Sequence, residues 1–581
     1  MNSSDFEAVE NSDPGISKIL LVFFVLFVIL FFFRLGSTGL IDVDEPRYAE
    51  AGREMLESGN WIVPQFNYHA RFDKPVFYYW LEAVSMKIFG VNEFAARLPS
   101  VLSALLCVYF VFYLLKTFYG NVCGILGALI LMSGFEFFSL SRFSVTDMTL
   151  SSLIACSLIC FFLGYNQLST SHRFFKLQIL EFSLWYILAF MFLGLAFLTK
   201  GPVSLIIFAS VVIPFFWWIG KLEYFYKSSS FWGGVVIFLV IVLPWYIAVH
   251  FATAGEFTKV FFSFHNISRY TGVVSGHKGS LFYFFPVLLI GFLPWTFFLP
   301  QAINSIFNKK LKSLLISPVS QLPWFCLWWS LIVFLFFSFS RTKLLTYIMP
   351  LFPALSIVVA LWFMELLNKR IGSFGLKAGL GVFFIFCLVV FYFCLFNLSS
   401  MLPREVKSLK LDLHIIYFAF LILVGISMAW AGSNKSIQMT LYIILSTFLI
   451  LYYSLVGFLL PKIDNHAQFK LRKFATSFSE DITIGTYQIL KPSLTFYSKR
   501  QIKKINSPER LQRMIDSDKK FAFVTKKKLL KEINIENVYK WGEDSRYVFF
   551  TNFLSGESVN MLYRNLNNIS LPQTEKENLK L

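Results

Sequence analysis

The sequence has little charge for its length. Of its 581 residues only 15% are Asp, Glu, Lys or Arg, whereas 56% are hydrophobic and 19% are aromatic, with 72 phenylalanines. Apolar runs of roughly 18 or more residues recur along the chain, and each is long enough to cross the hydrocarbon core of a bilayer. The composition therefore excludes an ordinary soluble protein and predicts a polytopic α-helical membrane protein.

Cysteine is scarce, and its spacing is uninformative. The seven cysteines lie in apolar runs and match neither a metal-binding pattern nor a disulfide framework, so we interpret them as small buried apolar side chains. The sequence also lacks an internal repeat of fixed period. Its polar tail contains no Gly-rich phosphate loop and no nucleophile elbow. The tail is therefore expected to be an accessory cap or an interaction domain rather than a catalytic one.

The first apolar run is interpreted as a retained transmembrane helix. It is too long for the apolar region of a signal peptide, and no A-x-A-like cleavage site follows it. Residues 1–15 are predicted to be disordered, residues 16–460 to form the transmembrane domain, and residues 36–97 to form its first large loop. We predict about thirteen transmembrane helices, at residues 16–35, 98–116, 121–138, 149–167, 181–199, 202–219, 231–251, 281–300, 322–339, 344–365, 376–397, 412–431 and 437–460.

Residues 461–581 are predicted to form a small soluble α/β domain. Strand-like runs such as ITIGTYQIL, FAFVTKK and YVFFTNFL alternate with the helical run ERLQRMIDSDKK. Residues 462–581 carry 22 Lys and Arg against 13 Asp and Glu, within a formal net charge of +18 for the whole chain. Beside a bilayer such positive charge is expected to meet lipid phosphates and anionic headgroups, not nucleic acid.

The stretch 39–75, GLIDVDEPRYAEAGREMLESGNWIVPQFNYHARFDKP, is unusually polar for a loop between two apolar runs. Asp44 is predicted to be the N-cap of a helix with Pro46 in its first turn, and Ser58-Gly59 is predicted to end that helix. A purely structural interpretation also exists. In it Asp44 only caps, while Arg47 pairs with Glu50 and Arg53 with Glu57.

Other loops predicted on the same side of the membrane repeat this pattern. They carry Arg142 and Asp147, then Lys200, then Glu256, His265 and Arg269, and finally Arg341, Lys343 and Tyr347. Charges at the edge of a bilayer are costly and are usually functional. The alternative is that they are interfacial anchors whose charged ends reach water without any chemistry. We predict that these loops assemble a site at the membrane interface.

Eight motifs in fixed order resemble a known family. They are DEPRYAE (44–50), SGNWIVPQFN (58–67), FDKP (72–75), FAARLPS (94–100), LTKGP (198–202), HNISRY (265–270), LPWTFFLP (293–300) and FFSFSRTKLLTYIMP (336–350). Together they resemble the lipid A 4-amino-4-deoxy-L-arabinose transferases, in the protein O-mannosyltransferase-like branch of the GT-C glycosyltransferases. The resemblance covers about residues 40–360. It implies a GT-C fold of thirteen helices, a cytoplasmic amino terminus, and an active site and carboxy-terminal domain in the periplasm, in the bacterial inner membrane.

The resemblance also implies roles for individual residues. Asp44, Arg47 and Asp147 match catalytic positions, Lys74 matches the lysine that meets the donor phosphate, and Asp73 and His265 match a carboxylate and a histidine that bind zinc. Arg269, Lys200 and Tyr347 are added as candidates for holding that phosphate. Two positions depart from the family pattern: Asp73 stands where FEKP has a glutamate, and Arg71 stands where an aromatic residue is more common.

The expected chemistry is sugar transfer from undecaprenyl phosphate to lipid A or another envelope acceptor. The leaving group is then a phosphate, which the cations would stabilise. A lipid A phosphate acceptor would need little general base, whereas a hydroxyl acceptor would need Asp44 or Asp147 to remove a proton. A protein or polysaccharide mannosyltransferase of the same superfamily is the first alternative. A transporter or flippase of a lipid-linked substrate is the second, although it would be expected to place charges in mid-helix.

Overall fold

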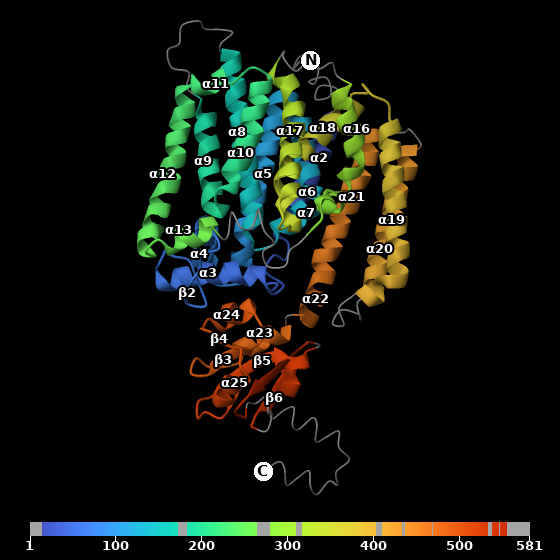
Figure 1. Cartoon of the computed structure of the whole chain (residues 1–581). Helices are drawn as coiled ribbons and strands as arrows, with labels where there is room; N and C mark the ends of the chain where they lie inside the picture. The colour runs from blue at the N-terminus through green and yellow to red at the C-terminus, as the bar shows by residue number, and fades with distance from the viewer. Residues whose placement is uncertain are drawn as a thin grey trace.

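The computed structural model describes residues 14–171, 183–263, 279–308, 317–401, 410–432, 436–467, 469–532, 537–544 and 546–554. The segment 1–15 predicted to be disordered lies outside these residues except for Pro14 and Gly15, which begin the first helix. Figure 1 shows a bundle of long helices, a thin layer across one end of the bundle, and a small domain of mixed strands and helices beneath that layer.

The bundle contains long helices together with short ones at their ends. In chain order its helices are α2 (Pro14–Phe32), α5 (Glu93–Tyr119), α6 (Asn121–Ser133), α7 (Phe135–Ser141), α8 (Thr146–Ser171), α9 (Leu184–Lys200), α10 (Val203–Trp218), α11 (Glu223–Tyr226), α12 (Ser229–Ala252), α13 (Glu256–Val260), η3 (Leu281–Tyr283), α15 (Phe284–Gly291), η4 (Trp295–Phe298), α16 (Leu299–Phe307), α17 (Pro318–Phe339), η6 (Leu345–Leu351), α18 (Phe352–Leu367), α19 (Phe374–Met401), α20 (Lys410–Gly432), α21 (Ile437–Ser454), η8 (Leu455–Leu459) and α22 (Leu460–Ala467).

The polytopic helical fold is confirmed. Among the described residues nine helices are long and apolar enough to cross a membrane, or up to eleven if each of two bent pairs is one span. The bent pairs are α6 with α7, at 72°, and Leu281–Gly291 with Trp295–Phe307, at 104°. The predicted segments 181–199 and 202–219 form α9 and α10, apolar helices of only 17 and 16 residues. Every predicted segment thus contains an apolar helix, but the number of thirteen spans stays a prediction.

Burial separates the centre of the bundle from its rim. The apolar windows of Thr146–Ser169 and Leu345–Leu367 are 100% buried, whereas those of Ser229–Ala252 and Leu411–Ala431 are only 17% buried. An apolar helix with an exposed surface is stable only where lipid covers it, so α12 and α20 form the lipid-facing rim. The six cysteines whose side chains are described are free and buried, as predicted.

The layer across the end of the bundle is the polar loop identified in the sequence. It contains α3 (Asp44–Ser58), α4 (Phe77–Phe89) and the two-stranded hairpin of β1 (Gln65–Phe66) and β2 (His69–Ala70). α3 ends where predicted, because Gly59 takes the left-handed conformation (φ 69°) and its N–H bonds to Met55 O at 3.1 Å. A Cβ on Gly52 would lie 2.8 Å from Cβ of Glu82, so this glycine allows α3 and α4 to pack closely.

The tail is the predicted α/β domain, although the preceding membrane helix continues through α22 before it begins. It contains α23 (Phe469–Thr476), β3 (Thr483–Tyr487), α24 (Pro492–Ser498), β4 (Lys503–Ile505), α25 (Pro508–Ile515), β5 (Phe521–Lys526), η9 (Lys527–Glu532), β6 (Tyr539–Glu543) and β7 (Tyr547–Thr551). The strand order is β4-β3-β5-β7-β6, with β4, β3 and β5 parallel and β7 and β6 antiparallel.

Apolar side chains lie on both faces of this sheet. Phe474, Ile484 and Leu494 belong to the cluster that packs α23 and α24, whereas Leu511 and Phe523 belong to the cluster that packs α25. A strand that is buried on both faces of a sheet has a nearly continuous apolar sequence, as FAFV in β5 does. In Figure 1 α24 faces the layer formed by α3 and α4.

Candidate functional site

The carboxylate of Asp44 does not cap α3, so that part of our sequence-based prediction is wrong. Val43 occupies the N-cap position and makes no side-chain capping bond, while Asp44 is the first helical residue and is exposed. A carboxylate in the first turn still gains from the positive end of the helix dipole. Asp44 thus has no capping bond to account for its place in the loop.

Structural pairing in α3 is partly as expected. Arg53 pairs with Glu57 at 2.6 Å, but Glu50 pairs with Arg53 at 2.7 Å rather than with Arg47. The side chain of Arg47 is half-buried, and its carbonyl accepts a bond from Arg71. The expected Arg47–Glu50 pair is therefore absent from the described contacts.

Arg71 clamps the FDKP segment onto α3. Its guanidinium donates to both oxygens of Asp73, at 2.5 and 2.8 Å, and to the carbonyl of Arg47 at 2.6 Å. The same group lies 5.0 Å from the ring centre of Tyr48 and 5.7 Å from that of Tyr79. Such a fork matches a carboxylate in two places at once, so the position and orientation of Asp73 are fixed.

Tyr48 lies among the charges of the site, although our reading of the sequence overlooked it. Burial raises the pKa of its phenol well above the usual value, and the negative charges of Asp73, Asp147 and Asp44 raise it further, while Arg71 opposes them. Tyr48 is thus a neutral hydroxyl that can donate a hydrogen bond among acids. It follows Arg47 directly in DEPRYAE, so the motif itself contained the signal.

Three predicted residues from separate loops meet on the side of this layer that faces the bundle. Asp147, at the start of α8, forms an ion pair with Lys200 at the end of α9, and it accepts a bond from Thr346 Oγ1 at 3.0 Å. Nζ of Lys200 lies 4.8 Å from the ring centre of Tyr347, at the start of η6. The structure therefore brings together Asp147, Lys200 and Tyr347, which are far apart in the sequence.

Lys74 connects this cluster to α3. Its side chain is 6% exposed, its Nζ donates to the carbonyl of Asp73 at 3.0 Å, and its charge acts on Asp147. A buried lysine whose charge acts on Asp147 is a strong local positive charge in a low dielectric. His265 and Arg269 lie outside the described residues, so their predicted roles stay predictions.

Two of the cations predicted on this side have structural roles instead. Arg142 donates to the carbonyls of Leu30, Phe31 and Phe33 at 2.7 to 2.9 Å, at the end of α2. Nζ of Lys343 donates to three carbonyls at the end of α17, the shortest contact being 2.6 Å. Both satisfy helix carbonyls that have no partner within the helix.

A buried ion pair that our sequence reading did not anticipate ties the loop to the bundle. Arg97 in α5 contacts both oxygens of Glu45, at 2.8 and 2.9 Å, and also donates to the carbonyls of Leu35, Thr38 and Gly39. Glu45 also accepts from the backbone N–H of Ser144 at 2.8 Å. Glu45 of the DEPR motif and Arg97 of the FAARLPS motif thus hold the start of α3 in place.

The tail domain holds the same region from the other side. The carboxylate of Asp42 accepts from Ser493 N at 3.0 Å and from Ser493 Oγ at 2.6 Å, and it pairs with Lys491 at 3.3 Å. Asn67 and Ile502 exchange two hydrogen bonds, at 3.0 and 2.7 Å. α24 therefore docks directly against the loop that carries Asp44.

The described residues do not by themselves form a zinc site. Both oxygens of Asp73 are engaged by Arg71, and the described part of the chain holds no group of three His, Cys, Asp or Glu side chains placed to ligate a metal. His265, the second predicted ligand, lies outside the described residues. A metal held by Asp73 and His265 therefore stays a prediction.

The fold and the site together define a polytopic membrane protein with a polar site at one end of its helix bundle. Residues 16–261 match the family model for dolichyl-phosphate-mannose-protein mannosyltransferase. A relative from Shewanella sediminis, named undecaprenyl phosphate-alpha-4-amino-4-deoxy-L-arabinose arabinosyl transferase, is 34% identical over 62% of this chain and 63% of its own length. A relative of the same name from Aeromonas salmonicida is 30% identical over 70% of each chain.

The chain belongs to the family of these arabinosyl transferases. Its match to the Shewanella relative covers a little less than two thirds of that protein. The crystal structure of ArnT from Cupriavidus metallidurans bound to undecaprenyl phosphate has the same fold, with a TM-score of 0.77 at 21% identity over 92% of this chain and 98% of that one. The expected GT-C fold is therefore confirmed.

Proposed function

We propose that this protein transfers an amino sugar, 4-amino-4-deoxy-L-arabinose, from undecaprenyl phosphate to lipid A or another envelope acceptor. The observation that carries the proposal is the meeting of Lys74, Asp147, Lys200 and Tyr347 at the end of the bundle, in a member of the arabinosyl transferase family. A bacterial inner membrane is the expected location, with the site and the tail domain facing the periplasm.

The proposed mechanism starts from the leaving group. When the bond between sugar and phosphate breaks, negative charge grows on the phosphate, and Lys74, a buried cation, would stabilise it. Lys200 is already paired with Asp147, so it would share its charge between that carboxylate and the donor. Arg269 and Tyr347 complete the proposed phosphate contacts.

The acids would act on the other partner. Asp44 is exposed at the amino-terminal end of α3, in the same helical turn as Arg47. There its carboxylate can orient an acceptor or stabilise a developing positive charge on the sugar. If the acceptor is a hydroxyl, Asp44 or Asp147 would take its proton. If it is a phosphate, it is ionised already and neither acid needs to do so.

A second candidate is protein or polysaccharide mannosyl transfer, which the match of residues 16–261 to the mannosyltransferase model favours. A transporter of a lipid-linked substrate is a more distant candidate. Against it, the acids and bases of the cluster come from the ends of α8 and α9 and from loops, not from mid-helix positions.

The test compares the lipid A of cells with and without the gene by mass spectrometry. We expect an added mass of one amino sugar on a phosphate only when the gene is present. A hexose on a protein or polysaccharide, with unchanged lipid A, would favour the mannosyltransferase instead.

Lys74→Gln tests the site itself. A charge-assisted contact to a phosphate contributes about 1.5 to 3 kcal/mol, so we expect donor binding or turnover to fall about ten- to a hundredfold. Lys462→Gln is a matched control, because Lys462 forms an exposed ion pair with Asp412, and an exposed pair contributes little. Parental turnover by Lys74→Gln in nanodiscs with a defined donor would move the phosphate site elsewhere.

The metal is tested on the same purified protein. The alternative to the clamp, in which Arg71 holds Asp73, is that Asp73 binds a zinc ion together with His265. Equal zinc content in the wild type and in His265→Ala, measured by plasma mass spectrometry, would remove the metal from the proposal.

A further inference from the structure

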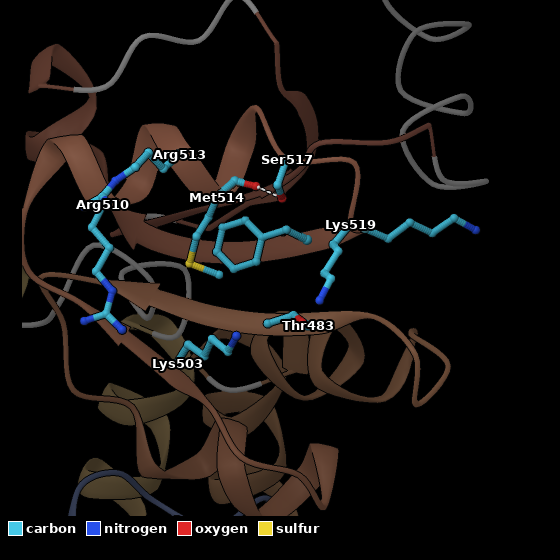
Figure 2. Close-up of a pocket in the computed structure, with 9 residues that line it drawn as sticks. Thr483, Lys503, Arg510, Arg513, Met514, Ser517 and Lys519 are labelled. Atoms are coloured by element: carbon cyan, nitrogen blue, oxygen red, sulfur yellow. Dashed lines mark hydrogen bonds between the residues drawn. The ribbon is translucent and has the colours of Figure 1, made fainter.

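The tail domain contains a basic pocket that the proposed transfer site does not use. The pocket has a volume of about 320 Å³ and is lined by Thr483, Lys503, Arg510, Arg513, Met514, Ser517, Lys519, Lys520 and Phe521. Five of these nine residues are cationic and none is acidic. In Figure 2 the guanidinium of Arg510 extends from its helix toward Lys503, and Met514 points its sulfur into the space between the helix and the strands.

The parallel strands place several lining residues at the amino-terminal ends of the strands. Thr483, Lys503 and Phe521 are the first residues of β3, β4 and β5, and Thr483 lies opposite Phe521 in the ladder. α25 contributes Arg510, Arg513 and Met514 to the same pocket. The pocket is thus built from four elements of the domain rather than from one flexible loop.

The floor of the pocket is apolar and requires a glycine. A Cβ on Gly485 would lie 2.9 Å from two ring atoms of Phe521, so the ring can lie over β3 only because this position has no side chain. The thioether of Met514 lies in the lining beside it. The ring of Phe521 is only 1% exposed, so the half-buried thioether of Met514 is the apolar group that a sugar ring can contact here.

The side chain of Asn552 fixes the loop that carries two of the cations, Lys519 and Lys520. The side-chain amide of Asn552 donates to the carbonyls of Ile515 and Lys519 at 3.1 and 3.0 Å, and its oxygen accepts from Phe521 N at 2.8 Å. Because these bonds bridge both ends of residues 515–521, they hold Lys519 and Lys520 at the mouth of the pocket.

One cation of this pocket, Lys520, has an acidic neighbour in Asp481. In the described part of the chain Lys503, Arg510 and Lys519 form no ion pair with a carboxylate. Cations gathered in a concave site, with an uncharged floor, attract an anion more strongly than the same cations spread over a surface. The ligand that matches both features is a sugar that carries a phosphate.

We infer that this pocket binds a phosphorylated saccharide, with the phosphate held by Lys503 and Arg510 and the sugar ring against Met514. The ligand can be a free sugar phosphate or a phosphorylated sugar within an envelope glycan, since both present the same chemistry. The site is independent of the proposed transfer site and gives the tail domain a recognition role.

The test uses the purified full chain in neutral detergent and measures the binding of glucose 1-phosphate by calorimetry. We expect binding that weakens with added salt, because the contacts are ionic. Inorganic phosphate should bind more weakly than glucose 1-phosphate, and glucose should not bind. Phosphate binding as tightly as the sugar phosphate would overturn the saccharide part of the inference.

Two neighbouring lysines on β4 provide a matched pair of variants. Lys503 lines the pocket, whereas Lys504 is also exposed but lies outside the lining, as the alternation of side chains along a strand requires. We expect Lys503→Glu and Arg510→Glu each to weaken binding about tenfold or more, and Lys504→Glu to leave it within about twofold. Equal effects of Lys503→Glu and Lys504→Glu would show only general attraction and would overturn the proposal.

The two sources of the ligand are separated by a second titration. A purified phosphorylated oligosaccharide from an envelope glycan is compared with the same oligosaccharide after enzymatic removal of its phosphates. Tighter binding of the phosphorylated oligosaccharide than of glucose 1-phosphate supports the glycan, and the reverse order supports the free sugar phosphate. No binding of either compound by the folded wild type would overturn the inference.

Discussion

Replacing Arg71 by lysine would separate its charge from its geometry. The guanidinium makes three hydrogen bonds, two to Asp73 at 2.5 and 2.8 Å and one to the carbonyl of Arg47 at 2.6 Å. A lysine ammonium at the same place carries the charge on one nitrogen and can reproduce about one of these contacts. The variant Arg71→Lys therefore tests whether the fork, and not the charge alone, holds the segment of Lys74 against α3.

The expected loss follows from the two contacts that lysine cannot make. A hydrogen bond to a charged group contributes about 1.5 to 3 kcal/mol, so even the lower value for each gives a loss of about 3 kcal/mol. If that ordering is needed for Lys74 to meet the donor, turnover should fall by about a hundredfold.

The assay is a double-mutant cycle with Asp73→Asn. Stability in detergent and turnover with a defined lipid-linked donor are measured for the parent, both single variants and the double variant. We expect a coupling energy between the two positions of about 1 to 3 kcal/mol, because they share a bidentate contact. Arg546→Lys, at an exposed position in the tail outside the pocket, is the control and should change stability by less than about 0.5 kcal/mol.

The reasoning would be refuted by a coupling energy below about 0.5 kcal/mol together with normal turnover of Arg71→Lys. That result would mean that Asp73 is held by other contacts. A gain of bound zinc in the Arg71→Lys variant would instead reveal that the clamp competes with a metal for Asp73.

Three further predictions concern the same layer. Asp44→Asn should abolish transfer. The variant should be expressed normally, because Asp44 makes no capping bond that could be lost, and near-normal transfer would argue against a catalytic role. Asp42→Asn weakens a contact to Ser493, so hydrogen exchange of that amide should become about tenfold faster or more, and unchanged exchange would contradict the docking role. Burial and the charge of Glu50 raise the pKa of Glu54 to about 8, so the folded protein holds a proton that the unfolded chain releases above about pH 4.3. Its contribution to stability is therefore lost as the pH rises from about 4.3 to 8, and Glu54→Gln should be relatively more stable at pH 9 than at pH 6; an unchanged difference between the two pH values would count against this.

The apolar pattern predicted the bundle well, because a helix in lipid must satisfy its own backbone and can do so only as a long apolar run. It could not predict the bends. The segment 121–138 is one apolar run, yet it folds as α6 and α7 with a 72° bend, because Gly134 lies outside the helical conformation (φ −63°, ψ 128°). Hydrophobicity reports where a segment lies and not whether it is straight.

The sequence predicted several residues that the structure brings together, but it predicted few of the contacts that these residues make. Asp147, Lys200 and Tyr347 were expected on one side, and the structure joins them. Local capping rules favoured Asp44 as an N-cap and failed, because Val43 takes the cap position without any side-chain bond. Lys343 was read as a loop charge but satisfies the carbonyls at the end of a helix, a role that depends on where α17 ends.

The docking of the tail on the first loop also sets the order in which the protein can be completed. Asp42 and its partner Ser493 are 451 residues apart in the chain. At about 5 to 20 residues per second, a ribosome would make the second partner roughly 20 to 90 seconds after the first. The loop beside Asp44 must therefore wait, exposed on the membrane, until nearly the whole polypeptide has been translated. A ribosome that stops early would leave a membrane-inserted chain whose loop never receives its cover.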